Sequence, residues 1–255
     1  DPLRERGILI LDFNPNNIKD NTIVVAGNAF LDDHEEIIAA RHNKTVTFYR
    51  YHEFLGTVME NFRSIAVSGC HGKTKTTTLL KDMLEAQYKT GSLIGDGRGD
   101  LNQNHEYFAV EACEYRRHFL AYYPEVAIMT NFEIDHVDYF KDDADYLSAY
   151  RDFAQNVKEK IIVWGDDPHF DQLDLPIDKV WTYGFNETND IYVKNVVKET
   201  NRTQFDLYFN QEFVKTFDLP LVGDHMILNA MAVIGVGLYE KTPLKNVELG
   251  LQNFS

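Results

Sequence analysis

Short apolar and β-branched runs alternate along the chain with segments whose apolar residues recur at helical spacing. The runs that we expect to form strands are 7–10, 22–27, 45–49, 65–67, 107–112, 125–131 and 160–164. The segments that we expect to form helices are 32–38, 51–60, about 73 to about 88, and 143–157. This alternation predicts an α/β fold with parallel strands and helices packed on the sheet.

The pattern changes after residue 166. Residues 181–183, 191–193, 205–209 and 213–217 are short strand-like runs at hairpin spacing, which predicts a small antiparallel sheet. An apolar helix follows from 223 to about 239. We therefore expect an N-terminal Rossmann-like parallel-sheet domain over 1–60. A second domain, over 61–255, would combine a parallel central sheet with the small antiparallel sheet.

A glycine loop joins the run 65–67 to the next helix, and its sequence is Gly69-Cys70-His71-Gly72-Lys73-Thr74. Backbone N–H groups of such a loop and the positive end of the helix attract anionic oxygens, which predicts a phosphate-binding P-loop. Lys73 would reach the β- and γ-phosphates, and the Thr74 hydroxyl would bind Mg²⁺. Val67 stands where the general pattern has its first glycine, and the alternative is a glycine turn beside a solvated lysine.

Composition limits the partners of this site. The chain has 255 residues, of which 44% are hydrophobic, and its formal net charge is −15. Such an acidic chain is not expected to bind nucleic acid or an anionic membrane, so a phosphate site must be a local positive pocket. Two cysteines and the lack of an apolar run of about 18 residues favour a cytoplasmic protein without a disulfide framework.

Two further strand ends carry side chains that bind metals. Glu111 ends the run 107–112, and His136 lies in the loop after the run 125–131. Because the carboxyl ends of parallel strands meet at one edge of a sheet, Thr74, Glu111 and His136 are candidate metal ligands. Hydroxyl and carboxylate oxygens suit Mg²⁺, whereas the imidazole would suit Mn²⁺ equally. The alternatives are a solvated glutamate and a histidine that is hydrogen-bonded within its loop.

Other residues near these strand ends admit two interpretations. Arg116 and Arg117 would bind an anionic substrate, or they belong to a charged helix surface. The helix N-terminus would lower the pKa of the Cys70 thiol, or Cys70 packs only as a small side chain.

Together these segments resemble the Mur ligases, which build the peptide of the bacterial cell wall. The matching motifs are Gly69–Thr74, Glu111-Ala112-Cys113-Glu114, Asn131-Phe132-Glu133-Ile134-Asp135-His136 and Gly223-Asp224-His225-Met226-Ile227-Leu228-Asn229-Ala230. Within that family the run 111–120 is similar to the alanine-adding subgroup as found in Firmicutes. The resemblance extends over nearly the whole chain.

The resemblance implies an ATP-dependent ligase that uses ATP and Mg²⁺. It would join L-alanine to the lactyl carboxylate of UDP-N-acetylmuramic acid through an acyl phosphate. Residues 1–60 would be part of a UDP-sugar-binding domain, residues 61–255 the central ATP-binding domain, and a C-terminal ligase domain would lie outside this sequence. Neither nucleic acid nor membrane is an expected partner. The alternatives are another Mur-family ligase, acting on a muropeptide or on folate, and a nucleotide-binding module without ligase activity.

The resemblance also implies roles for individual residues. Lys73 would contact the γ-phosphate, Asn131 would position the reacting groups, and His136 would hold a second metal ion that bridges the substrate carboxylate. Thr74 and Glu111 would hold the first metal ion. The residues expected to contact ATP are Gly69, Cys70, His71, Gly72, Lys73, Thr74 and Lys75, with His225 and Asn229 at the adenine.

Overall fold

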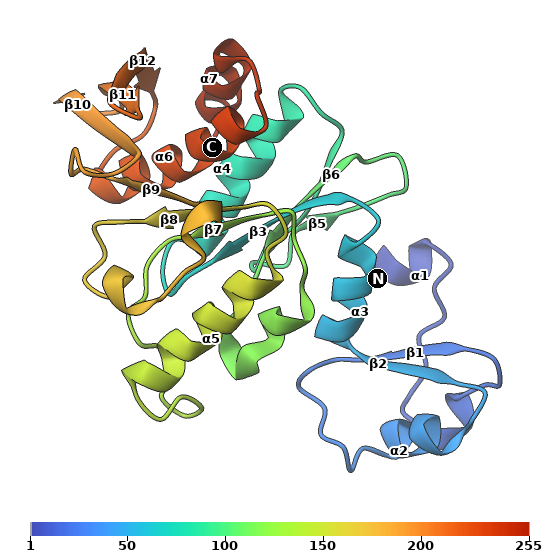
Figure 1. Ribbon diagram of the computed structural model, residues 1–255. Coiled ribbons are helices and arrows are strands. Elements are labelled where there is room, and N and C mark those ends of the chain that lie inside the picture. The colour runs from blue at the N-terminus through green and yellow to red at the C-terminus, as the bar shows by residue number, and fades with distance from the viewer. Residues whose placement is uncertain (1, 255) are drawn as a thin grey trace. The chain divides into compact units, whose positions relative to one another are not determined.

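The computed structural model describes residues 2–254, which form two compact units that meet between Thr57 and Val58. The smaller unit contains a parallel pair of strands, β1 and β2, in which Ile23 lies opposite Thr47. Helices flank this pair (Figure 1). The elements are α1 (Pro2–Glu5), η1 (Pro15–Asn17), β1 (Ile23–Ala26), α2 (Glu35–His42), β2 (Thr47–Arg50) and α3 (Tyr51–Met59), which continues into the larger unit.

The strand expected over 7–10 is wrong. Residues 8–10 pair with neither β1 nor β2, and the side chain of Leu9 is 78% exposed. An extended segment becomes a strand only when a neighbour takes up its backbone N–H and C=O groups. The apolar, β-branched composition of 7–10 therefore was not sufficient to predict a strand.

The larger unit is built on one ten-stranded sheet in the order β12-β11-β10-β9-β8-β7-β3-β6-β4-β5. The seven neighbouring strands from β10 through β9, β8, β7, β3 and β6 to β4 are parallel. At the two edges of the sheet, β11, β12 and β5 run antiparallel to their neighbours. The strands are β3 (Arg63–Ser68), β4 (Thr90–Leu93), β5 (Gly99–Asp100), β6 (Tyr107–Glu111), β7 (Val126–Met129), β8 (Lys160–Trp164), β9 (Val180–Gly184), β10 (Ile191–Lys198), β11 (Thr203–Phe209) and β12 (Glu212–Leu219).

This sheet confirms the predicted α/β class and its parallel centre. The antiparallel strands are present, but they extend the central sheet instead of forming a small sheet of their own. The reason is the run at 181–183, which belongs to β9 and pairs in parallel with β8, with Trp181 opposite Ile162. Strand β10 then pairs in parallel with β9, so the hairpin strands β10–β12 continue the same hydrogen-bonded ladder.

Helices cover both faces of the central sheet (Figure 1). On one face, α4 (Lys73–Glu85), α6 (Asp224–Tyr239) and α7 (Leu244–Gln252) pack on the strands. The other face carries α5 (Asp143–Asn156) and η2 (Tyr115–Ala121), and short turns η3 (Phe170–Gln172) and η4 (Ile177–Lys179) follow β8. Ile65, Leu80 and Val233 are fully buried in the core between β3, α4 and α6. Burial on both faces fixes where the parallel strands end.

Helix α6 is highly apolar, and its apolar surface is buried against β8, β9 and α4. Across residues 2–254, no helix has both the length and the apolar character that crossing a membrane would require.

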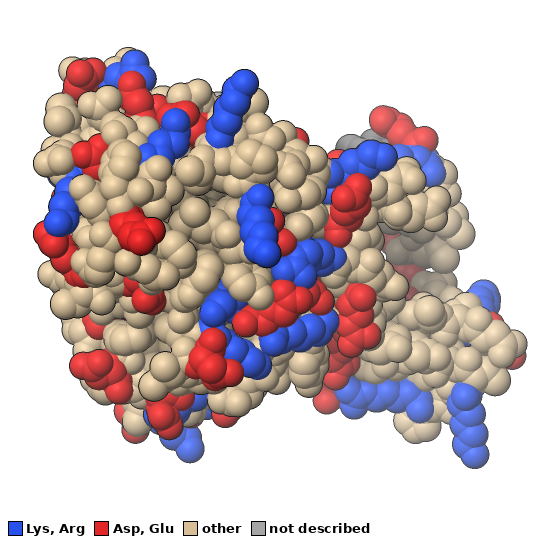
Figure 2. All heavy atoms as spheres, turned by 45° about the horizontal axis from the view of Figure 1, so that its top comes forward, with Lys and Arg blue, Asp and Glu red and all other residues tan. Residues whose placement is uncertain are grey.

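Charged side chains of opposite sign are interleaved on the protein surface. Figure 2 shows Lys and Arg set among Asp and Glu on one face. Ion pairs account for part of this mixing, since Lys81 contacts Glu85 at 2.6 Å and Lys158 contacts Glu125 at 2.8 Å. Surface cations are therefore partly neutralised by neighbouring acids.

The contact between α7 and α4 yields a test of the fold. A Cβ on Gly250 would lie 2.4 Å from Met83 Cα, which is backbone that cannot rotate away. We expect Gly250→Ala to lower the free energy of unfolding by about 1–3 kcal/mol, although alanine favours helix formation. Urea unfolding measures this change. Leu249→Ala, on the exposed side of α7, is the control, and an equal loss in both variants would contradict the close approach.

Candidate active site

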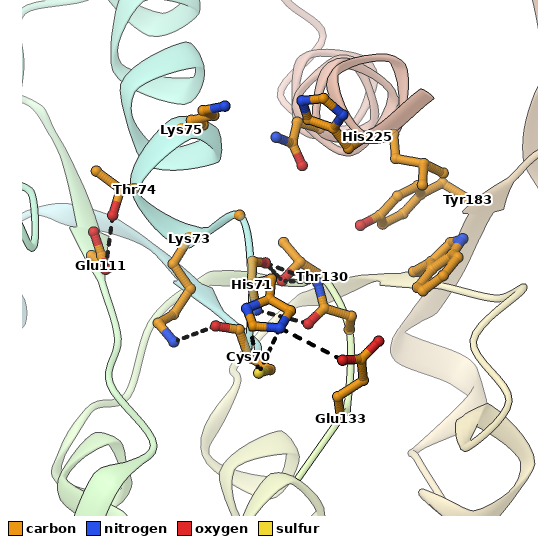
Figure 3. A pocket seen from close by; sticks show the side chains of 15 residues that line it. Cys70, His71, Lys73, Thr74, Lys75, Glu111, Thr130, Glu133, Tyr183 and His225 are labelled. Atoms are coloured by element: carbon orange, nitrogen blue, oxygen red, sulfur yellow. Dashed lines mark hydrogen bonds and ion pairs between the residues drawn. The ribbon is translucent and has the colours of Figure 1, made fainter. Parts of the chain in front are cut away.

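A pocket of about 730 Å³ opens at the carboxyl ends of the parallel strands of the larger unit (Figure 3). The loops after β3 and β7, the ends of β6, β8 and β9, and the first turns of α4 and α6 supply its lining residues. Parallel α/β sheets bind ligands at this edge because loops from neighbouring strands converge there. Residues 70–75, Glu111 and Asn131 line this one pocket, whereas His136 is not among its lining residues.

The P-loop is held in shape by Asn131. The Asn131 side chain accepts a hydrogen bond from His71 N at 2.8 Å and donates one to His71 O at 2.8 Å. The backbone carbonyl of Asn131 accepts from Cys70 N at 3.1 Å. Gly69 has φ +130°, and a Cβ there would lie 2.1 Å from Thr130 Oγ1, so only glycine fits. Both ends of the Asn131 amide thus bind the loop backbone.

Lys73 folds back over this loop. Its Nζ donates to Gly69 O at 2.5 Å and Cys70 O at 3.1 Å, and it contacts the Glu114 carboxylate at 3.1 and 3.3 Å. The Glu114 side chain is fully buried. The sequence analysis quoted Glu114 in a motif but gave it no role. Its burial depends on the turn into η2, which the residue pattern does not indicate.

Thr74 and Glu111 meet as predicted from the strand ends. The Thr74 hydroxyl donates to Glu111 Oε1 at 3.3 Å, and Gly95 N donates to Glu111 Oε2 at 2.8 Å. Hydroxyl and carboxylate oxygens are the donors that Mg²⁺ prefers, so this pair fits one metal ion.

His136 lies in a second group of ligand atoms. Its Nε2 is 3.7 Å from Glu114 and 3.8 Å from Asp135, and the three side chains offer ligand atoms within 4.8 Å of one another. His136 has φ +54°, and its N–H donates to Asp135 Oδ1 at 2.7 Å. One nitrogen and two carboxylates suit Mn²⁺ as well as Mg²⁺. The candidates Thr74, Glu111 and His136 therefore divide between two groups, and Glu114 and Asp135 join the second.

The opposite side of the pocket is formed by α6 and two aromatic residues. His225 and Asn229 line it, and a Cβ on Gly72 would lie 3.1 Å from Asn229 Oδ1. Trp164 and Tyr183 line the pocket too, and Figure 3 shows Tyr183 and His225 across the pocket from Glu111. The sequence analysis did not assign Trp164 or Tyr183. Their positions at the ends of β8 and β9 are the signal that could have identified them.

Three other candidates differ in outcome. Lys75 is exposed where it lines the pocket. Arg117 binds Asp145 at 2.7 Å and Ser148 at 2.8 Å on α5, which identifies it as a structural cation. Burial, together with the charge of Asp135, raises the pKa of the Cys70 thiol to about 11, so the suggested lowering by the helix is wrong.

A protein-family model, that of the Mur ligase middle domain, matches residues 67–237 of this chain. The chain belongs to the Mur ligase family. The matched region begins in β3 and ends within α6, so this Mur ligase domain contains every residue of the pocket.

Solved structures of Mur ligases share the fold. The UDP-N-acetylmuramate–alanine ligase of Thermotoga maritima is 24% identical with a TM-score of 0.78, over 99% of this chain and 59% of that chain. The UDP-N-acetylmuramate:L-alanyl-γ-D-glutamyl-meso-diaminopimelate ligase of Neisseria meningitidis is 22% identical with a TM-score of 0.81, over 100% and 86%. A MurF ligase from Thermotoga maritima in complex with ADP is 16% identical with a TM-score of 0.66, over 92% and 64%. This chain thus spans about 59% of the length of the alanine ligase it matches.

Glu111 gives a test of the first metal group. A Cβ on Gly95 would lie 2.5 Å from Glu111 Oε1 and push the carboxylate out of its place beside Thr74. We expect Gly95→Ala to weaken Mg²⁺-dependent binding of ADP about tenfold or more and to leave metal-free binding unchanged. Calorimetric titrations with Mg²⁺ and with EDTA measure both. Gly99→Ala, in β5, is the control, and an equal effect of both substitutions would contradict this role of Gly95.

Cys70 gives a test of the electrostatics of the loop. With a pKa of about 11, its thiol stays protonated near neutral pH and reacts slowly with iodoacetamide. In a Cys113→Ser background, we expect the alkylation rate to rise steadily with pH until about pH 11, as followed by mass spectrometry. Asp135→Asn should shift this profile to lower pH, because it removes one of the two main causes. A rate that levels off below about pH 9 would contradict this interpretation.

Proposed function

We propose that this chain is the nucleotide-binding part of an ATP-dependent amide ligase in peptidoglycan synthesis. The observation that supports this most directly is the position of Lys73, which lines the pocket, contacts Glu114 of one group of candidate metal ligands and directly precedes Thr74 of the other. Membership of the Mur ligase family supports the same class of reaction. The two cysteines and the absence of a long apolar run agree with a cytoplasmic site of action.

The proposed substrates are UDP-N-acetylmuramic acid and L-alanine. The run 111–120 supports this choice through its likeness to the alanine-adding subgroup, and the similar Thermotoga maritima structure is named as an alanine ligase. We propose that residues 1–60 contribute to binding the UDP-sugar, and that residues 61–255 bind ATP. A further ligase domain would supply the rest of the active site, in keeping with the share of the relatives that this chain spans.

In the proposed reaction the substrate carboxylate attacks the γ-phosphorus of ATP, and ADP leaves. The carbon of the resulting acyl phosphate is attacked by the alanine amine, which loses a proton as phosphate departs. The first step brings two anions together, so charge neutralisation and alignment dominate its barrier. Lys73, the loop N–H groups and the positive end of α4 supply fixed positive charge at the phosphates.

The chain's own residues fit the metal ions that this chemistry uses. Thr74 and Glu111 would hold one Mg²⁺, and Glu114, Asp135 and His136 would hold a second, with Mn²⁺ as a substitute. When bound, such ions neutralise phosphate and carboxylate charge. Asn131 would act by holding the P-loop in shape, and His225 and Asn229 would contact adenine beside Trp164 and Tyr183.

A substrate panel on the full-length protein tests this proposal. We expect phosphate release from ATP to require both UDP-N-acetylmuramic acid and an amino acid, with alanine, glycine and serine the only amino acids used. Lys73→Ala should lower the rate by at least about a hundredfold, because charge compensation at the γ-phosphate is lost.

Other outcomes of the panel identify the alternatives. Ligation of a tripeptide to the UDP-sugar would identify a murein peptide ligase, which the similarity to the Neisseria structure makes the second candidate. Release of phosphate without any amine would indicate a plain ATPase. An unchanged rate in Lys73→Ala would contradict the role given to the P-loop.

A further inference from the structure

The buried Glu114 carboxylate depends on one cation for its charge compensation. Its side chain is fully buried, and Lys73 Nζ approaches both of its oxygens, at 3.1 and 3.3 Å. Within residues 2–254, the other basic group within 4 Å of this carboxylate is His136, whose Nε2 is 3.7 Å away. A buried carboxylate without a compensating charge is strongly destabilising. Glu114 therefore needs Lys73 or a substitute for it.

Lys73 has no N–H donor to spare for a bound nucleotide in this structure. An ammonium group has three N–H donors. In this structure they are directed to Gly69 O, Cys70 O and Glu114. To contact the phosphates of a nucleotide in the P-loop, Nζ has to give up some of these partners. When Glu114 is among the partners given up, its carboxylate lacks its counter-charge.

A group that could replace the ammonium is already assembled around Glu114. Asp135 and His136 offer ligand atoms within 4.8 Å of one another and of Glu114. The two carboxylates come from the loops after β6 and β7, so the fold itself brings them together. Two carboxylates and an imidazole nitrogen suit a divalent cation such as Mn²⁺ or Mg²⁺.

We propose that Lys73 and a divalent cation alternate as the counter-charge of Glu114. Without nucleotide, the Lys73 ammonium neutralises Glu114 and repels a metal ion from Glu114, Asp135 and His136. When a nucleotide draws Lys73 to its phosphates, the metal ion takes over the carboxylate. Binding of nucleotide and binding of this metal ion are then positively coupled, and by linkage the coupling is reciprocal. The proposal rests on the proposed function only in taking a nucleotide as the ligand of Lys73.

Nucleotide-free Lys73→Met gives the sharpest test. Methionine keeps most of the side-chain stem but lacks the charge, so Glu114 becomes available to a metal ion. We expect this variant to bind Mn²⁺ about tenfold or more tightly than the wild-type protein, as measured by electron paramagnetic resonance of free Mn²⁺. A lysine that acted only on phosphates would give no such gain.

Matched variants separate this effect from a change in net charge. Lys75→Met removes the same charge from an exposed position on the same helical turn and should leave Mn²⁺ affinity within about twofold of wild type. Lys73→Met combined with Glu114→Gln should lose the gain. Equal Mn²⁺ affinities in folded wild-type protein and Lys73→Met would overturn the proposal, as would a gain that survives Glu114→Gln.

A second measurement covers the case in which Lys73→Met does not fold. Glu114→Gln frees Lys73 from its carboxylate partner, so it should bind ADP in EDTA several-fold more tightly than wild type. Equal or weaker metal-free binding in a folded Glu114→Gln would overturn the exchange. The Mn²⁺ experiment uses no nucleotide and no ligation, so a failed substrate panel would refute the proposed function without affecting this result.

Discussion

The arrangement of the site depends on the parallel pairing of β3 with both β6 and β7. Val67 lies opposite Glu111 on one side and Ile128 on the other, so the loops that follow the three strands leave the sheet at nearly the same level. The apolar residues of β3 are fully buried, which leaves no freedom for the register to slip. Hydrophobic burial in the strands thus determines where the phosphate loop, a carboxylate and an amide meet.

Hydrogen bonds then fix the conformations of the loops and side chains that the sheet brings together. Asn131 holds the backbone of the P-loop, and Gly95 N fixes the Glu111 carboxylate beside Thr74. At the centre lies a buried ion pair between Lys73 and Glu114, inside a protein with a net charge of −15. Such a pair contributes little net stability, because desolvation of both charges offsets most of their attraction. In the proposed exchange its significance is functional, since another cation would take the place of Lys73 beside Glu114.

Much of this arrangement was predictable from the sequence, and the remainder depends on tertiary context. Lys73 and Thr74 follow from the glycine-loop motif, and Glu111 follows from the rule that strand ends of a parallel sheet share an edge. The burial of Glu114 could not be predicted in this way. The chain turns directly after it, where Arg116 and Arg117 both have positive φ, and no residue pattern there indicates that conformation. Trp164 and Tyr183 reach the pocket through the parallel register of β8 and β9, which the hairpin-like spacing of the later strands obscured. For residues 8–10 the sequence predicted a strand that is not present, because this segment of high strand propensity pairs with no other strand.

Gly72, in the bend before α4, lies close to Asn229 of α6, so α6 packs directly against that bend. A Cβ at position 72 would come within 3.1 Å of the Asn229 amide, and that amide lies at the start of α6, whose first turns also present His225 and Leu228 to the pocket. The proposed contacts to the base and to the phosphates are therefore made by two segments that pack directly against each other. Redesign of this pocket would have to vary the glycine bend and the first turns of α6 together.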